Sequence, residues 1–151
     1  MKKKINENDK LVVTGIFGFQ KKVKQELPLF ISKISAGFPS PADDYVENKL
    51  DLNEHLIEHP AATFFVKVEG NSMNNAGIYS GDILIVDRSL EPSDKKIVVA
   101  VVNGDFTVKR IKKTQDKLYL MPENPVYNPI EINQDMDFEI WGVVTYVIHK
   151  P

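Results

Sequence analysis

The chain has 151 residues, of which 42% are hydrophobic, and a formal net charge of −2 at pH 7. This length allows one buried core and does not favour two full domains. The chain contains no cysteine, which excludes disulfides, thiolate metal sites and catalysis by a thiol.

The N-terminal segment is basic and the rest of the chain is acidic. Residues 1–36 carry eight lysines and three acidic residues, a net charge of +5, so the remainder carries −7. A basic arm can contact nucleic acid or can be a solvated tail attracted to its own domain. Without an arginine cluster or interleaved aromatic residues, the second reading is favoured. An acidic body argues against sequence-specific DNA binding by the core.

The first residues only faintly resemble a secretory signal. The apolar run at residues 11–17 follows three lysines, but it is short, contains Thr14 and Gly15, and precedes further lysines rather than a small-residue cleavage site. No stretch approaches the roughly 20 apolar residues of a membrane span. We therefore expect a cytoplasmic protein without membrane contact.

The first 60 residues contain few strand-like runs and several prolines. Pro39 and Pro41 each remove a backbone N–H and favour extended geometry in the preceding residue. The sequence therefore predicts an extended, flexible N-terminal arm with at most short helical turns, such as one at residues 53–58.

From Thr63 onward the pattern predicts a mainly β fold with a bent antiparallel or mixed sheet. The expected strands cover residues 63–68, 82–87, 97–102, 106–111, 117–121 and 138–148. The 97–102 run is apolar throughout, which predicts burial on both faces. Asn103-Gly104 predicts a type I′ hairpin turn, and Gly142 a bulge in the last strand.

Histidines do not form a recognisable metal motif. His55 and His59 are four residues apart and can share a helical face, whereas His149 is distant in the sequence. With no third ligand in a known spacing, they are expected on a polar surface. No metal and no other cofactor is predicted.

Ser72 is a candidate nucleophile. It follows a predicted strand and Gly70, which permits a sharp turn at the edge of the sheet. A helical turn starting near Ser72 would also offer free backbone N–H groups as an oxyanion site. Taken alone, a serine at such a position is more often a helix cap.

A serine nucleophile needs a base, and no histidine fits the pattern, which leaves carboxylates or a neutral lysine. Lys109 shares a strand face with Thr107 and lies beside the 97–102 run. Desolvation there would lower the lysine pKa from about 10.4 toward neutrality. The alternative is an ordinary strand lysine in water. Arg110 cannot replace it because a guanidinium stays protonated.

Ala36-Gly37 is a candidate cleavage site. Two small residues beside prolines can enter a tight active site, and Gly37 lies 35 residues before Ser72. At roughly 3.3 Å per extended residue, this segment can reach its own active site or that of a second copy. By itself, Ala-Gly is more often part of a linker.

These features occur in order inside longer motifs, and together they resemble the LexA/UmuD-type self-cleaving Ser-Lys peptidases over about residues 27–148. The motifs that carry the resemblance are Ala36–Glu47, Asp51–Asn53, His59-Pro60, Phe64–Lys67, Gly70–Met73, Gly81–Asp87 and Gly104–Lys109. Asn71 departs from the family, where an acidic residue is frequent before the serine. Residues 1–26 have no assigned counterpart.

The resemblance implies one self-cleavage between Ala36 and Gly37. Lys109 would take the proton from Ser72, and the backbone N–H groups of Ser72 and Met73 would hold the oxyanion. The chain would then divide into an N-terminal arm at 1–36 that is removed, an extended linker at 37–62 and a peptidase domain at 63–151.

The resemblance also implies a role in the SOS response. A filament of RecA on single-stranded DNA would stimulate cleavage, and the shortened chain would form a homodimer. This dimer would join a UmuC-type subunit in an error-prone polymerase for lesion bypass.

Three alternatives remain. A LexA-like repressor would need a helix-turn-helix of roughly 60 to 70 residues before the cut, where this sequence has 36. A regulatory binding module would keep the fold for partner interaction and dispense with catalysis. A signal-peptidase relative is disfavoured because the sequence shows no membrane anchor.

Overall fold

The computed structural model describes residues 11–19, 24, 26–30 and 47–151. The predicted cleavage site Ala36-Gly37 lies outside the described residues. The chain divides into two compact units, one formed by Met1–Phe19 with His59–Pro151 and the other by Gln20–Glu58. No helix in the described part is long and apolar enough to cross a membrane.

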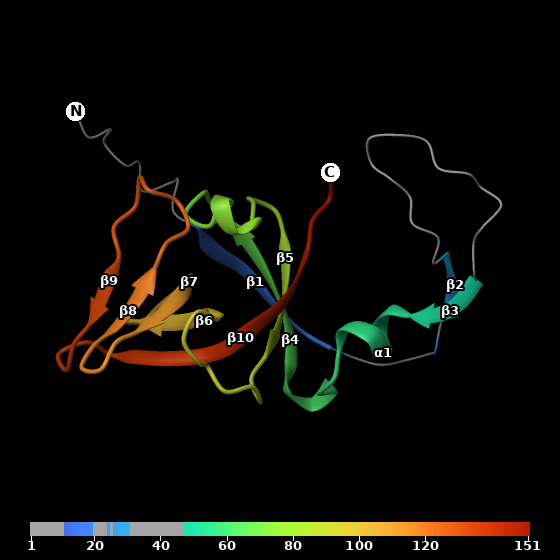
Figure 1. The fold of residues 1–151 in the computed structure, drawn as a ribbon, viewed down its shortest axis with the longest axis horizontal. Coiled ribbons are helices and arrows are strands. Elements are labelled where there is room, and N and C mark those ends of the chain that lie inside the picture. Colours follow the sequence, from blue (N-terminus) through green and yellow to red (C-terminus); the bar gives the residue numbers. More distant parts are fainter. Residues whose placement is uncertain (1–10, 20–23, 25, 31–46) are drawn as a thin grey trace. The chain divides into compact units, whose positions relative to one another are not determined.

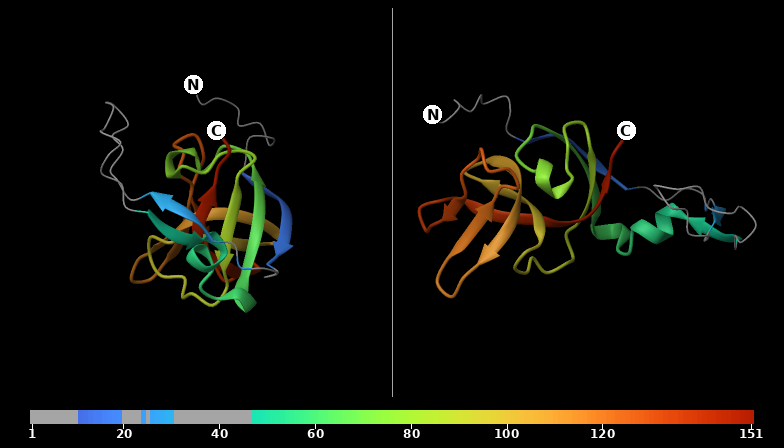
Figure 2. Two further views of the ribbon diagram at one scale, coloured as in Figure 1. Left: turned by 90° about the vertical axis from the view of Figure 1, so that its right-hand side faces the viewer. Right: turned by 45° about the horizontal axis from the view of Figure 1, so that its top comes forward.

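The larger unit is built on an eight-stranded sheet with the order β1-β4-β5-β10-β6-β7-β8-β9 (Figure 1). Every recorded pairing in it is antiparallel, and Figure 2 shows its strong curl from two further directions. Its strands are β1 (Val12–Gly18), β4 (Thr63–Glu69), β5 (Ile83–Asp87), β6 (Ile97–Val102), β7 (Asp105–Lys113), β8 (Leu118–Met121), β9 (Ile130–Ile132) and β10 (Phe138–Ile148). Two 3₁₀ turns, Pro60–Ala62 and Asn74–Ala76, flank β4.

The long strand β10 produces much of the curl. Its first half pairs with β6 and its second half with β5, so one strand links two parts of the sheet. The curl brings β1 next to β7, although the two strands are not paired. β1 and β7 therefore lie on either side of the region that contains the candidate site.

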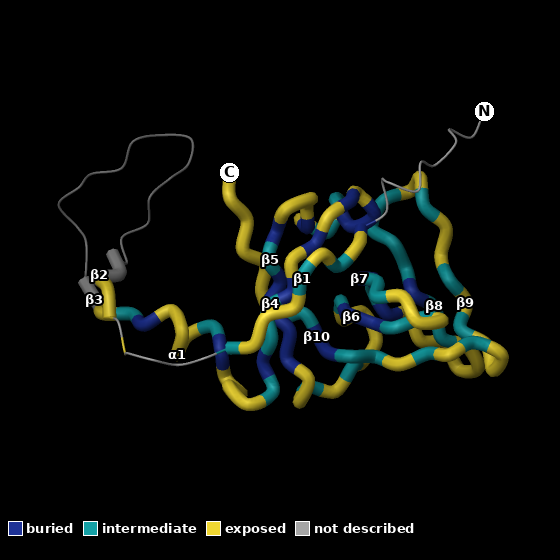
Figure 3. Tube along the Cα trace, turned by 180° about the vertical axis from the view of Figure 1, so that it is seen from behind, coloured by how far each residue is buried: buried dark blue, intermediate teal, exposed yellow. Residues whose placement is uncertain are grey.

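The core has two clusters on either side of β6. Val99 belongs to the cluster that also contains Met73 and Val108, whereas its neighbour Val98 packs with Ile111. Alternate residues of a strand point to opposite faces, so the centre of β6 is buried on both. Figure 3 shows the buried residues concentrated in the central strands. The sequence-based expectation for this run is confirmed at its centre.

The predicted mainly β fold is confirmed. The bounds of β6 and β10 agree with the expectation, and the other four predicted strands differ by one or two residues at one or both ends. Asn103 and Gly104 have φ values of 49° and 87°, as a type I′ turn requires. The register of β10 against β6 shifts between Ile140 and Gly142, at the predicted bulge.

We expected an extended arm with few strand-like runs up to residue 60 and did not predict β1. This segment pairs with β4 along the edge of the main sheet, and Leu11, just before the strand, is 2% exposed in the core. The partner strand lies about 50 residues later, so local sequence gives little indication of the pairing. β9 was also missed, because a three-residue strand leaves no clear periodicity.

The smaller unit contains two further strands that were not expected. β2 (Glu26–Phe30) pairs with β3 (Glu47–Asp51) in a two-stranded sheet. A proline in β2 is compatible with this arrangement because each strand has an unpaired edge. Helix α1 is Leu52–Leu56 rather than residues 53–58, and its N-cap Asp51 accepts hydrogen bonds from the backbone N–H groups of Asn53 and Glu54.

Candidate active site

Ser72 lies in the turn that follows β4. The chain leaves the strand at Glu69 and turns at Gly70, whose φ of 110° is rarely adopted by residues with a side chain. The Gly70 N–H donates to Oγ of Ser80 at 3.2 Å, and the 3₁₀ turn begins two residues after Ser72. The Ser72 side chain is fully buried. The turn therefore holds a hydroxyl inside the protein rather than at its surface.

Lys109 reaches this hydroxyl from the middle of β7. Its Nζ is 3.1 Å from Oγ of Ser72, although the two residues are 37 positions apart in the sequence. The same Nζ is 3.0 Å from Oγ1 of Thr107 and 3.0 Å from the carbonyl oxygen of Val108. Lys109 is only 7% exposed. The structure thus brings the two candidate residues to hydrogen-bond distance in a buried environment.

Thr107 was not identified from the sequence as a partner of Lys109. The signal was available, because residues i and i+2 of a strand share a face and these two were expected to do so. What the sequence does not determine is the side-chain conformation that brings Nζ to 3.0 Å from the threonine oxygen.

Among the described residues, no acceptor is found for the backbone N–H groups of Ser72 and Met73. Within the described part of the chain, neither donates to a backbone carbonyl. Both precede the short turn Asn74–Ala76, in which the Met73 carbonyl accepts from the N–H of Ala76. Free N–H groups beside a nucleophile can stabilise a developing oxyanion.

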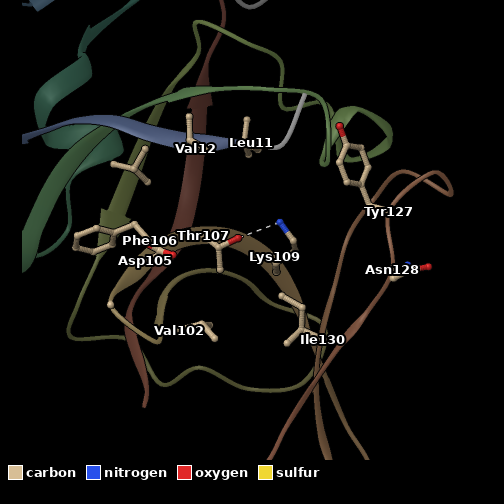
Figure 4. A pocket seen from close by; sticks show the side chains of 12 residues that line it. Leu11, Val12, Val102, Asp105, Phe106, Thr107, Lys109, Tyr127, Asn128 and Ile130 are labelled. Carbon is tan, nitrogen blue, oxygen red and sulfur yellow. Dashed lines mark hydrogen bonds between the residues drawn. The ribbon is translucent and has the colours of Figure 1, made fainter. Parts of the chain in front are cut away.

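A pocket of about 880 Å³ opens beside Lys109. Its walls are formed by residues 11–13 at the start of β1, by residues 105–107 with Lys109 on β7, and by Tyr127, Asn128 and Ile130, with Val102 and Gly104 completing the lining. Figure 4 shows these side chains around the pocket, with the Lys109 amine directed into it. Lys109 lines the pocket, whereas the Ser72 side chain has no exposed surface. The pocket is large enough for a peptide segment.

Two of the histidines pair with buried aspartates. Nδ1 of His59 is 2.6 Å from Oδ2 of Asp87, and Nδ1 of His149 is 2.6 Å from Oδ1 of Asp82. Both rings are about half exposed, and His55 is exposed in the smaller unit. No group of three potential metal ligands occurs among the described residues.

Asp87 is held in its charged form. Burial raises the pKa of this carboxyl, but hydrogen bonds from Ser89 and the pairing with His59 outweigh burial, and the net pKa is below its ordinary value. The Ser89 N–H and hydroxyl both donate to Oδ1 of Asp87, at 2.8 and 2.6 Å. Because serine and histidine both bind the carboxylate rather than each other, this is not a catalytic triad.

Comparison with known proteins places this chain in a family of peptidases. Residues 28–145 match the model of a family described as Peptidase S24-like. The chain is 45% identical to protein SamA of Salmonella typhimurium strain LT2, over 87% of this chain and 91% of that protein. It is 46% identical to protein MucA of Escherichia coli, over 80% and 82% respectively. It is 35% identical to a LexA repressor of Pseudomonas chlororaphis, over 88% of this chain and 66% of the repressor.

Proposed function

Since this chain belongs to the peptidase S24-like family, we propose that it is a self-cleaving serine peptidase with Ser72 as nucleophile and Lys109 as general base. The single observation that carries the proposal is the 3.1 Å separation between Oγ of Ser72 and Nζ of Lys109, both of them buried. The expected resemblance to LexA/UmuD-type peptidases is confirmed by the family match and by the LexA relative.

The reaction requires Lys109 to be neutral. Lys109 is only 7% exposed, and burial of this kind disfavours the charged ammonium form. A neutral amine has two N–H donors and one lone pair. The N–H groups can donate to Thr107 and to the carbonyl of Val108, and the lone pair can accept the hydroxyl proton of Ser72. These three contacts can also be made by the neutral amine, the form of lysine that can act as a base.

The proposed reaction cuts the bond between Ala36 and Gly37. Lys109 takes the hydroxyl proton of Ser72 as Oγ attacks the carbonyl carbon of Ala36, and the tetrahedral oxyanion is held by the N–H groups of Ser72 and Met73. The C–N bond then breaks, and Lys109 gives its proton to the amine of Gly37. A water molecule next attacks the ester carbonyl and passes its proton through Lys109, which releases the Ala36 carboxylate and restores Ser72.

The pocket beside Lys109 is the proposed site for the scissile segment. The small residues at 36–37 would fit between β1 and β7, two of the strands that line the pocket. The division of the chain into a removable arm at 1–36, a linker at 37–62 and a peptidase domain at 63–151 is part of the same proposal. β1 would then belong to the removed fragment, although it pairs with β4 in the uncut chain.

The biological setting follows from the resemblance. We propose that the protein acts in the cytoplasm, that a filament of RecA on single-stranded DNA stimulates its cleavage, and that the shortened chain forms a homodimer. The dimer would join a UmuC-type subunit in translesion synthesis. Similarity to SamA and MucA over more than four fifths of each protein supports a role of this kind over that of a repressor.

Mass spectrometry of the purified full chain tests the proposal. Incubation with RecA filament should yield a fragment that begins at Gly37, and Ser72→Ala should abolish it. If Ser72→Ala remains uncut but keeps full mutagenic activity in cells, the fold serves partner binding and cleavage is dispensable. Cleavage of the Ser72→Ala chain at the same bond would contradict the proposed nucleophile.

A further inference from the structure

The turn that carries Ser72 is held by the connection between β8 and β9. The backbone N–H of Glu123 donates to the carbonyl oxygen of Ser72 at 2.9 Å, and the N–H of Asn75 donates back to the carbonyl of Glu123 at 2.8 Å. The side-chain amide of Asn124 donates to the carbonyl oxygen of Asn71 at 2.9 Å. Three hydrogen bonds thus fix the nucleophile's turn to residues that lie about 50 positions later in the chain.

Glu123 is in turn fixed to the strand that carries the base. Nε of Arg110 donates to Oε1 of Glu123, and Nη1 of Arg110 donates to the carbonyl of Lys95 at 2.7 Å. Arg110 directly follows Lys109 in β7, so the two side chains point to opposite faces of the sheet. The same strand therefore carries the base and, through the side chain of Arg110 and Glu123, is connected to the nucleophile's turn.

We propose that Glu123, supported by Arg110 and Asn124, is a positioning residue for the reaction. This inference deepens the proposed function, on which it rests, by naming what sets the distance between Nζ of Lys109 and Oγ of Ser72. These two atoms come from separate elements, and their 3.1 Å separation depends on how the turn is held against β7. The three residues are called the Glu123 clamp below.

The Glu123 clamp affects the rate of self-cleavage more than the free energy of unfolding. The side chains of Arg110 and Glu123 are 35% and 28% exposed, and ion pairs accessible to solvent contribute little to folding. A displacement of about 1 Å at a reacting group, in contrast, costs on the order of a hundredfold in rate. Loss of the clamp therefore lowers the cleavage rate in a chain that stays folded.

The first test compares self-cleavage of the full chain across pH. Glu123→Ala and Asn124→Ala should each lower the maximal rate by roughly tenfold, a partial displacement of the turn. The pH midpoint should stay unchanged, because neither residue touches the Lys109 amine. Glu123→Gln, which keeps an acceptor for Arg110, should recover most of the rate.

The matched control is Glu131→Ala. It removes a cross-strand ion pair with Lys117, 3.1 Å long, between β8 and β9, and leaves the Ser72 turn untouched. Its rate should equal that of the unmodified chain. Equal rates for Glu123→Ala and Glu131→Ala would overturn the proposal. So would a shifted pH midpoint in Asn124→Ala, because the residue would then act on the proton of Lys109 rather than on the position of Ser72.

A second measurement does not depend on cleavage. In a Ser72→Ala background, which keeps the backbone carbonyl at this position, hydrogen exchange of the Asn75 and Glu123 amides should be faster with Glu123→Ala than with Glu131→Ala. Identical exchange would overturn the Glu123 clamp even in a chain that cleaves normally. Faster exchange in this background, together with no self-cleavage of the unmodified chain, would support the clamp and refute the proposed function, so the two failures are distinguishable.

Discussion

Replacement of Thr107 by valine isolates the contribution of one contact to the proposed base. Valine keeps the branched shape of threonine and removes Oγ1, which lies 3.0 Å from Nζ of Lys109. A net hydrogen bond contributes about 0.5–1.5 kcal/mol, which corresponds to a rate loss of roughly twofold to more than tenfold if the contact orients the amine during reaction. In the unmodified chain, the Thr107 oxygen stabilises the charged amine more than the neutral one. Its removal should therefore lower the pKa of Lys109.

The assay is the rate of unaided self-cleavage as a function of pH, followed by mass spectrometry. Thr107→Val should lower the maximal rate and move the pH midpoint to a lower value. Thr145→Val is the control, because it removes another threonine hydroxyl of the same sheet. This hydroxyl donates to the carbonyl of Ile85 at 3.3 Å and makes no recorded contact with Ser72 or Lys109. An unchanged maximal rate in Thr107→Val, or an equal loss in Thr145→Val, would refute the reasoning.

Three further predictions concern the fold around the site. Asp87→Asn should lower the free energy of unfolding by about 1 kcal/mol at pH 6. Because the pKa of Asp87 is lower in the folded state, this difference is fully present above the unfolded pKa of about 3.9 and should vanish as the pH falls through the folded pKa. Denaturant unfolding of both chains at a series of pH values measures it. Leu11→Ala should cost about 2 kcal/mol in thermal unfolding, at the low end for a buried leucine because it lies at a sheet edge, whereas Val12→Ala, at a residue 44% exposed, should cost far less; equal costs would show that β1 does not contribute to the core. Gly70→Ala and Gly81→Ala both place a side chain at positive φ, 110° and 92°, and should destabilise the protein by about 1–3 kcal/mol each, but only Gly70→Ala should also slow cleavage at a temperature where both variants are folded.

The strands after residue 60 could be predicted because their signals are local. Alternation, apolar runs and the Asn103-Gly104 turn each depend on a few neighbouring residues, and β6, β7 and β10 follow from them. β1 could not be predicted in this way, because its stability depends on pairing with β4 and on burial of Leu11 in a core that forms later in the chain.

In the candidate site, too, contacts between distant parts of the chain could not be predicted from local sequence. Spacing along the chain does not indicate that Ser72 and Lys109, 37 positions apart, lie in contact. Each residue taken alone was only a weak candidate, and the two were assigned to one site by the family resemblance. The contacts of Glu123 to the Ser72 turn run through backbone atoms, which every residue has. No side-chain pattern indicates such contacts, so they become visible only in three dimensions.

The central claim is that a buried, neutral Lys109 activates Ser72, and the pH dependence of unaided self-cleavage tests it most directly. The rate of appearance of the fragment beginning at Gly37 should rise as pH increases toward about 10 and deprotonates the amine. Lys109→Ala should lower the rate by about 10²- to 10⁴-fold, the usual contribution of a general base. A rate that does not change with pH over this range, or that survives in Lys109→Ala, would contradict the account.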